Sequence, residues 1–267
     1  MTDHWVSTAK GRLFAKRWGG DSRKAPIVLF HDSLGCVALW RSFPEQLSAA
    51  TGRTVIAYDR LGFGRSDPYP SRLDFDFMGE EAGVSLPALR RHFGFDRFVA
   101  LGHSVGGEMA VMTAGAYPAD CEAVVTVAAQ SFIEDCTRAG IREAERAFAE
   151  PGAMDRLAKY HGDKAEWVLN AWIRTWLSPD FADWTLDADL ARVRCPVLAV
   201  HGADDEYGST EQPRRIVSLV AGPSTLEIIP GCGHVPHREQ EGLLIELVSR
   251  FLERNAVDTV ENAEIAS

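Results

Sequence analysis

The sequence predicts an α/β fold in which a mostly parallel sheet is flanked by helices. Short runs of β-branched and other apolar residues alternate along the chain with segments of helical length, and strands that are apolar on both faces are typical of buried parallel sheets. One long helical excursion interrupts this alternation before the last strands. At 267 residues the chain has a length at which one such domain forms a single core.

The chain opens with two segments that predict an antiparallel hairpin. Apolar and polar residues alternate in HWVST and in RLFAKRW, which a turn at Lys10-Gly11 separates. Buried, mainly parallel strands are then expected at PIVLF (26–30), TVIAY (54–58), RFVAL (97–101), AVVTV (123–127), PVLAV (196–200) and TLEII (225–229). Helices are expected at 39–50, 78–92, 105–117, 211–220 and 238–254. Right-handed crossovers place such helices on both faces of the sheet.

The alternation of strands and helices stops between residues 131 and 190. No strand-like run occurs there, and IREAERAFAE, AMDRLAKYHG and AEWVLNAWIRTWL are typical of helices. An excursion of this length between two sheet strands predicts a helical cap over one edge of the sheet. We therefore expect a core formed by 1–130 and 191–255, a cap at 131–190, and a flexible acidic tail at 256–267.

Charge and composition restrict the partners of the chain. Its formal net charge of −10 repels nucleic acid and anionic membranes. No apolar run is long enough to cross a bilayer and no secretion signal precedes the first strands, so we expect a cytoplasmic protein that acts on a small molecule. The five scattered cysteines fit neither a disulfide framework nor a zinc site. A homo-oligomer is compatible with the sequence.

The stretch GHSVGG at 102–107 predicts a nucleophilic serine. It follows an expected strand and precedes an expected helix, and a sharp turn between them crowds the residues two before and two after Ser104, which are both glycine. Such a turn strains the backbone by about 1–3 kcal/mol. It also exposes the hydroxyl at the carboxyl edge of the sheet, beside the free N–H groups of the helix. A plain helix-entry turn has the same pattern, but this context favours a nucleophile.

A serine nucleophile requires a base and an acid that orients the base. Asp205 and His234 each come just after an expected strand, so both should emerge at the same sheet edge as Ser104, and the chain order Ser, Asp, His suits this architecture. Asp204 and His237 are the alternatives. We prefer Asp205 because it stands three residues after a glycine turn, and His234 because His237 lies where the next helix begins. The six other histidines are interpreted as hydrogen-bonding, packing or surface residues: His4, His31, His92, His103, His161 and His201.

The oxyanion that forms during attack on a carbonyl requires two hydrogen-bond donors. The first is expected to be the backbone N–H of Val105, directly after the nucleophile. The second is expected from the loop 31–35 (HDSLG), with the N–H of Ser33 as our choice. A purely structural interpretation is also open, in which His31 and Asp32 pin the turn by hydrogen bonds.

Five motifs in order resemble those of the α/β-hydrolase family: LFHDSLG, AYDRLGFGRSD (57–67), GHSVGG, HGADD and GCGHVPH. The resemblance is to its compact branch with a cap, which includes esterases, carbon–carbon bond hydrolases and haloperoxidase-like enzymes. Two positions depart from the family. Asp32 stands where glycine is more frequent, and His103 stands where the carbon–carbon hydrolases of aromatic degradation usually have asparagine. A serine nucleophile argues against haloalkane dehalogenase or epoxide hydrolase chemistry.

The resemblance implies a serine hydrolase that cleaves a small carboxylic ester or lactone through an acyl-enzyme, with Ser104 as nucleophile and no metal or organic cofactor. The alternatives are a carbon–carbon bond hydrolase of a diketo acid, a ligand-binding receptor on the same fold, and a cofactor-free oxygenase that uses only the His–Asp pair. Aromatic residues near the motifs and on the cap are candidate substrate contacts, although aromatic residues also serve as packing. They are Trp40, Phe63, Phe132, Trp172 and Trp176.

Overall fold

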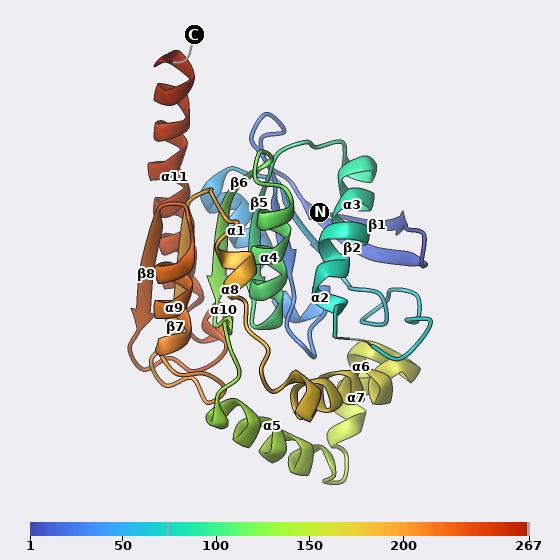
Figure 1. The fold of residues 1–267 in the computed structure, drawn as a ribbon. Helices are drawn as coiled ribbons and strands as arrows, with labels where there is room; N and C mark the ends of the chain where they lie inside the picture. The colour runs from blue at the N-terminus through green and yellow to red at the C-terminus, as the bar shows by residue number, and fades with distance from the viewer. Residues whose placement is uncertain (74, 266–267) are drawn as a thin grey trace.

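The computed structural model describes the backbone of residues 1–73 and 75–265, and the side chains of the same residues as far as Asn255. Within these residues eight strands form one sheet in the order β1-β2-β4-β3-β5-β6-β7-β8 (Figure 1). Their bounds are β1 Thr2–Ser7, β2 Arg12–Trp18, β3 Ile27–Phe30, β4 Val55–Tyr58, β5 Phe98–His103, β6 Cys121–Val127, β7 Val197–Gly202 and β8 Ser224–Ile229. β1 and β2 pair antiparallel, β2 pairs antiparallel with β4, and every later neighbour is parallel. The predicted mostly parallel sheet and its opening hairpin are confirmed.

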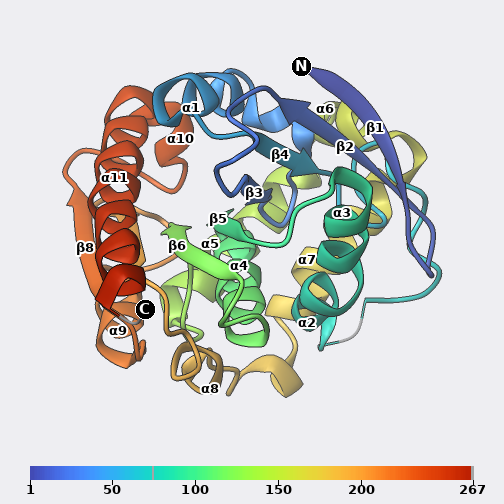
Figure 2. The same ribbon diagram turned by 90° about the horizontal axis from the view of Figure 1, so that it is seen from above.

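Side chains alternate across the sheet and divide the core into two layers. Val28 and Phe30 of β3 face one layer, whereas Ile27 and Leu29 face the other. Helices α3 (Leu86–Phe93) and α4 (Val105–Ala116) cover the first face, and α1 (Phe43–Thr51) and α11 (Glu241–Ile265) cover the second. Figure 2 shows the sheet between these two groups of helices. The apolar runs in the sequence are therefore strands buried on both sides, as expected.

The expected helix at 78–92 is interrupted in the structure. It consists of α2 (Phe77–Glu80), a π-helical turn at Glu81–Ser85, and α3. Pro87 explains the interruption, because proline has no N–H to donate and its ring collides with the carbonyl four residues earlier. The expected helix at 238–254 begins as a separate short helix, α10 (Pro236–Glu239), before α11.

Four helices form most of the cap segment, 131–190. They are α5 (Asp135–Phe148), α6 (Ala153–His161), α7 (Ala165–Trp176) and α8 (Asp187–Leu190). Figure 1 shows α5, α6 and α7 beyond one end of the sheet. The two ends of the segment meet, because Phe132 pairs with Thr185 and the N–H of Leu186 donates to the carbonyl of Ser131 at 2.9 Å. The division of the chain into a core and a cap at these boundaries stays a prediction.

Helix α9 (Glu211–Leu219) completes the described helices around the sheet. The backbone of α11 continues as far as Ile265, so most of the segment expected as a tail is helical in backbone conformation. The last two residues, 266 and 267, lie outside the described residues, and flexibility of this segment stays a prediction. None of the described helices combines the length and the apolar character that crossing a membrane requires.

We predict that Gly102→Ala destabilises the fold by about 2 kcal/mol or more, because a Cβ at this position would overlap the backbone of Gly106 and Gly107. Urea unfolding followed by circular dichroism measures the change. Gly242→Ala is the matched control: it lies in α11, and its Cβ would meet no atom outside its own helix within 4 Å. The control should be neutral or slightly stabilising. Equal stability of the two variants would contradict the close contact at Gly102.

Candidate active site

Ser104 occupies a strained turn between β5 and α4. Its backbone has φ 53° and ψ −129°, a region that residues other than glycine rarely adopt. The N–H of Ser104 donates to the carbonyl of Val127 at 2.8 Å. A Cβ at Gly102 would overlap the carbonyl of Gly106, and a Cβ at Gly106 would overlap the carbonyl of Phe30. The two glycines therefore allow the turn that the sequence motif predicts.

His234 and Asp205 are hydrogen-bonded to each other. Nδ1 of His234 lies 2.9 Å from both carboxylate oxygens of Asp205, whose side chain is fully buried. The same carboxylate accepts the N–H of Tyr207 at 2.8 Å and lies 3.2 Å from Nε2 of His201. Asp204 is exposed, and its N–H donates to the carbonyl of Cys232. The structure thus brings Asp205, and not Asp204, to His234.

This pairing shifts the pKa of both groups. Burial by itself would lower the pKa of His234, but the hydrogen bond and the charge of Asp205 outweigh burial and hold that pKa above its ordinary value. Burial by itself would raise the pKa of Asp205, and the hydrogen bond from His234 reverses the effect and lowers it. The pair is therefore an oriented imidazole with a carboxylate that stabilises its protonated form.

Ser104 and His234 line the same cavity, of about 230 Å³, which we call the serine cavity. Because Nδ1 of His234 is bound to Asp205, Nε2 is the ring nitrogen left to serve the serine. Among the described residues the Ser104 hydroxyl makes no hydrogen bond, so its oxygen is not engaged by a structural partner. Hydrogen bonds of catalytic groups are often long in the absence of substrate and shorten when the reacting complex forms.

The expected oxyanion donors lie next to the nucleophile. Val105 is the first residue of α4, so its N–H has no partner within the helix. Ser33 lines the serine cavity together with Ser104. A Cβ at Gly106 would overlap the carbonyl of Phe30, so α4 begins directly against the end of the strand from which the Ser33 loop departs.

His31 and Arg60 fasten the loop that carries Ser33. Nε2 of His31 accepts the N–H of Arg60 at 3.1 Å, so Nδ1 carries the proton and donates to the carbonyl of Asp32 at 2.8 Å. The guanidinium of Arg60 donates to the same carbonyl at 2.9 Å. His31 therefore pins this turn, as the structural interpretation of the motif expects, and the pinned turn also presents Ser33 to the cavity.

Two residues hold the loop that carries His234. Nε2 of His103 lies 2.7 Å from the carbonyl of His234 and donates to it. The carboxylate of Glu239 accepts the N–H groups of Gly233 at 2.6 Å and Val235 at 2.9 Å. Glu239 was not identified from the sequence, although a carboxylate in the first turn after a glycine-rich loop is a signal for such a clamp.

The alternative base, His237, does not line the serine cavity. Its ring is buried and lies 4.7 Å from the ring of Trp40 and 4.6 Å from that of His103. Burial lowers its pKa well below the ordinary value. His161, interpreted from the sequence as a surface or packing residue, is buried and polar in its contacts: Nδ1 accepts the N–H of Gly64 at 2.9 Å and Nε2 donates to the carbonyl of Leu34 at 3.0 Å.

The predicted substrate contacts divide into two groups. Trp172 and Trp176 of α7 line the serine cavity. Trp40, Phe63 and Phe132 do not line it, and here the structure corrects the sequence interpretation. The ring of Trp40 is stacked on that of Phe43 in the core. Phe63 is buried under the guanidinium of Arg60, at 4.0 Å, and Phe132 lies against Arg215. Their nearness to motifs in the sequence did not determine which way these rings point.

Four polar residues of the cavity wall were missed in the sequence. Asp32, Gln130, Glu206 and Tyr207 all line the serine cavity. Asp32 directly precedes Ser33, and Glu206 and Tyr207 are the two residues after Asp205. Adjacency to predicted site residues was therefore the available signal for these three. Gln130 is fixed by a hydrogen bond from its amide to the carbonyl of Tyr207 at 2.9 Å.

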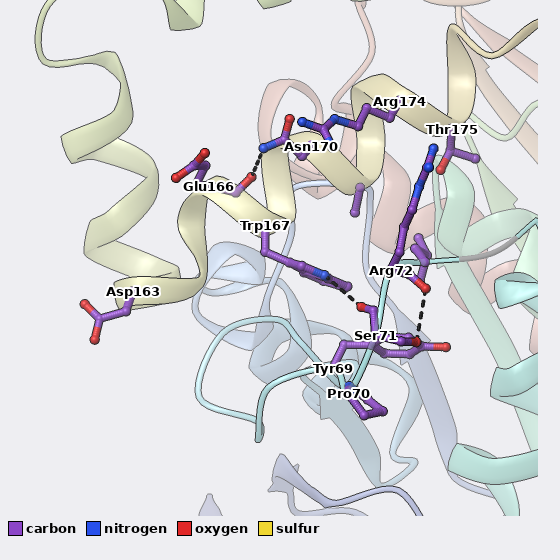
Figure 3. Close-up of a pocket in the computed structure, with 12 residues that line it drawn as sticks. Tyr69, Pro70, Ser71, Arg72, Asp163, Glu166, Trp167, Asn170, Arg174 and Thr175 are labelled. Atoms are coloured by element: carbon purple, nitrogen blue, oxygen red, sulfur yellow. Dashed lines mark hydrogen bonds between the residues drawn. The ribbon is translucent and has the colours of Figure 1, made fainter.

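A larger cavity, of about 640 Å³, lies on the other face of α7 (Figure 3). We call it the outer cavity. It is bounded by α7 and by the chain at 69–73, and Nε1 of Trp167 donates to the carbonyl of Ser71 there at 3.2 Å. None of Ser104, Asp205 and His234 lines the outer cavity. Ser104 and His234 line the smaller serine cavity, which is therefore the candidate site of the reaction.

Comparison with known proteins supports this view of the fold. A family model described as the alpha/beta hydrolase fold matches residues 25–158, which is about half of the chain. A proline iminopeptidase of Lactobacillus delbrueckii subsp. bulgaricus is 24% identical over 295 residues, with 94% of this chain and 98% of that protein covered. A thermophilic esterase from Thermogutta terrifontis has a similar structure, with a TM-score of 0.74 at 19% identity, covering 96% of this chain and 99% of the other.

A stronger local similarity covers less of the chain. A 1-acylglycerol-3-phosphate O-acyltransferase of Rattus norvegicus is 37% identical over 117 residues, which are 42% of this chain and 32% of that protein. The chain thus matches about a third of the length of this relative. Together the comparisons support a hydrolase fold without selecting one substrate.

We predict that Asp205→Asn lowers the pKa of His234. In the wild-type protein that pKa lies above its ordinary value of 6.5 because of the Asp205 carboxylate, and without the carboxylate the effect of burial dominates. Imidazole NMR as a function of pH measures the shift. Asp204→Asn, one residue away and not in contact with His234, should leave the pKa unchanged. An unchanged pKa in Asp205→Asn would show that the pair is not coupled in solution.

Proposed function

Because the chain belongs to the α/β-hydrolase family, we propose that it is a serine hydrolase that cleaves a small carboxylic ester or lactone. The observation that carries the proposal is the hydrogen bond from His234 to the buried Asp205, beside a cavity that His234 shares with the strained Ser104. A serine on such a turn has no evident structural purpose, whereas a nucleophile requires exposure next to an oriented base.

In the proposed reaction the Ser104 oxygen attacks the carbonyl carbon of the substrate while Nε2 of His234 takes the hydroxyl proton. The N–H groups of Ser33 and Val105 donate to the resulting oxyanion. The tetrahedral intermediate then collapses, the alcohol leaves with the proton from His234, and an acyl-enzyme remains. Water attacks the acyl group with His234 again as base, which releases the acid and restores Ser104.

Asp205 contributes to the proposed reaction in two ways. It keeps the proton of neutral His234 on Nδ1, so that Nε2 is the atom that accepts a proton. It also stabilises the imidazolium that forms, which agrees with the raised pKa of His234. Since the base must be neutral at the start, we expect the acylation rate to fall as the pH drops through that raised pKa.

The dimensions of the cavity support a small substrate. Its volume of about 230 Å³ is below the range of roughly 300–1,000 Å³ that is usual for drug-sized ligands. Trp172, Trp176 and Ile141 supply apolar wall, which suits a short hydrocarbon segment next to the reacting carbonyl.

A second candidate is hydrolysis of an amide by the same groups. The observation that favours it is the similarity to a proline iminopeptidase over nearly the full length of both chains. Ester and amide cleavage share the nucleophile, the base and the oxyanion donors, so the two candidates differ in the leaving group that His234 protonates. Parallel assays of p-nitrophenyl esters and amino-acid p-nitroanilides separate them.

We predict that a fluorophosphonate probe labels Ser104 and that Ser104→Ala abolishes the labelling. The kcat/KM for a short p-nitrophenyl ester should fall by about 10⁴-fold or more in this variant, because the nucleophile is lost. Mass spectrometry of the adduct and steady-state kinetics provide the measurements.

Ser22→Ala is the control for this experiment, since Ser22 is exposed and lies outside the site. It should label and turn over ester as the wild type does, and thermal melts should show that both variants are folded. Labelling of Ser104→Ala equal to that of the wild type would refute the role of this serine.

A further inference from the structure

We infer that the serine cavity selects substrates that carry a positively charged ammonium group, which the carboxylates of Asp32 and Glu206 attract. The inference rests on the proposed function and names the substrate class of the same cavity. Four features of the structure lead to it: the charge of the cavity wall, the surroundings of the two carboxylates, the aromatic rings of the same wall, and the position of Asp32 beside the oxyanion donors.

The wall of the serine cavity carries two acidic side chains and, apart from the candidate base His234, no basic one. Asp32 comes from the loop after β3 and Glu206 from the loop after β7, and no lysine or arginine is among the described residues that line the cavity. The arginine of α7, Arg174, belongs to the outer cavity instead. A substrate carboxylate would therefore meet two carboxylates and no lysine or arginine in the wall, whereas an ammonium group would be attracted.

In the described part of the chain no lysine or arginine forms an ion pair with either carboxylate, although the buried Arg60, which donates to the backbone carbonyl of Asp32, interacts with the Asp32 charge from behind the loop. Oδ2 of Asp32 lies 3.8 Å from Nδ1 of His103, but burial lowers the pKa of His103 to about 4. The proton of the neutral ring is on Nε2, which donates to the carbonyl of His234. Nδ1 therefore presents a lone pair, and not a charge, to Asp32.

Glu206 is placed beside the loop of the candidate base. A Cβ at Gly233 would lie 3.3 Å from Oε2 of Glu206, so its carboxylate lies against the backbone next to His234. The charges of Glu206 and Asp32 both contribute to the raised pKa of His234, after burial and the contribution of Asp205. The two carboxylates thus act on the reacting groups from two different loops.

Two aromatic rings line the same cavity as the carboxylates. The ring of Tyr207 lies 4.8 Å from that of His234 and 6.0 Å from that of Trp172, in edge-to-face arrangements. Tyr207 and Trp172 both line the cavity. Faces of such rings attract cations, most strongly where water is displaced. Carboxylates combined with aromatic rings are the surroundings that an alkylammonium group requires.

The position of Asp32 connects binding to the reaction. It precedes Ser33, whose N–H is the proposed donor to the oxyanion, so its carboxylate opposes the negative charge that develops there. A cation held by the substrate offsets this repulsion in the transition state. We therefore expect an ammonium group to raise kcat as well as to lower KM.

The test compares p-nitrophenyl esters with acyl chains of matched length: aminohexanoate with a terminal ammonium, uncharged heptanoate, and the monoester of pimelate with a terminal carboxylate. A second series places the charge on the alcohol, with choline butanoate and its uncharged carbon isostere. In at least one series kcat/KM for the cationic ester should exceed that of the neutral ester by about tenfold, a size expected for partly screened charges. The pimelate ester should be the poorest of its series.

Glu206→Gln and Asp32→Asn should each reduce the cationic preference to about threefold, because each removes one charge. Glu211→Gln, at an exposed carboxylate at the start of α9, should leave the preference unchanged. Raising NaCl from about 0.05 M to about 1 M should shrink the wild-type preference, since salt screens the attraction. A preference near one in both series, or one that both substitutions leave unchanged, would overturn the inference.

A binding measurement separates this inference from the proposed function. If Ser104 is labelled and the neutral esters turn over without a cationic preference, the inference fails and the function stands. If no ester turns over, the preference for a cation can still be tested by binding. Hexylammonium and hexanoate should quench tryptophan fluorescence when they bind, because Trp172 and Trp176 line the cavity. Hexylammonium should then bind at least about fivefold more tightly, and equal binding would refute the inference.

Discussion

The contact between the start of helix α4 and the carboxyl ends of β3 and β5 is the constraint on which the candidate active site depends. Side chains at Gly102 or Gly106 would overlap backbone atoms, so strand and helix approach more closely than any other residue permits. This approach requires the positive φ of Ser104 and directs the first N–H groups of α4 toward the loop after β3. One packing contact therefore positions both the serine and the donors beside it.

The loops that carry Asp32 and His234 lie outside helices and strands, so side chains supply hydrogen bonds that hold their backbone. Arg60 and His103 are buried and reach backbone carbonyls of Asp32 and His234, while Glu239 accepts two N–H groups of the His234 loop. Hydrogen bonds of this kind, several of them charge-assisted, fix loop geometry more firmly than neutral contacts do. The site is thus preorganised by residues that do not themselves touch the cavity.

Sequence reasoning succeeded where position along a strand determines the outcome. Asp205 and His234 follow strands whose carboxyl ends share one edge, so their convergence follows from a parallel sheet. The substrate wall was harder to predict, because Trp40 and Phe63 lie near motifs but turn into the core, and only the packed structure determines that direction. Pro87 could have indicated the break in the helix at 78–92. Asp32 and Glu206 were not predicted as cavity residues because their neighbours, Ser33 and Asp205, had already been assigned as oxyanion donor and acid.

Asp32 is the position at which local structure conflicts with the chemistry proposed for the site. A carboxylate beside the oxyanion loop opposes the charge that forms there, and His103 cannot offset it because its only proton is committed to the carbonyl of His234. In the open cavity water screens this charge. When a substrate fills the cavity that water leaves, and a cation on the substrate would then take over part of the screening. The hydrogen bond that holds the His234 loop therefore leaves His103 without a charge to offer Asp32, and a cation on the substrate would add to the attraction that Arg60 supplies from behind the loop.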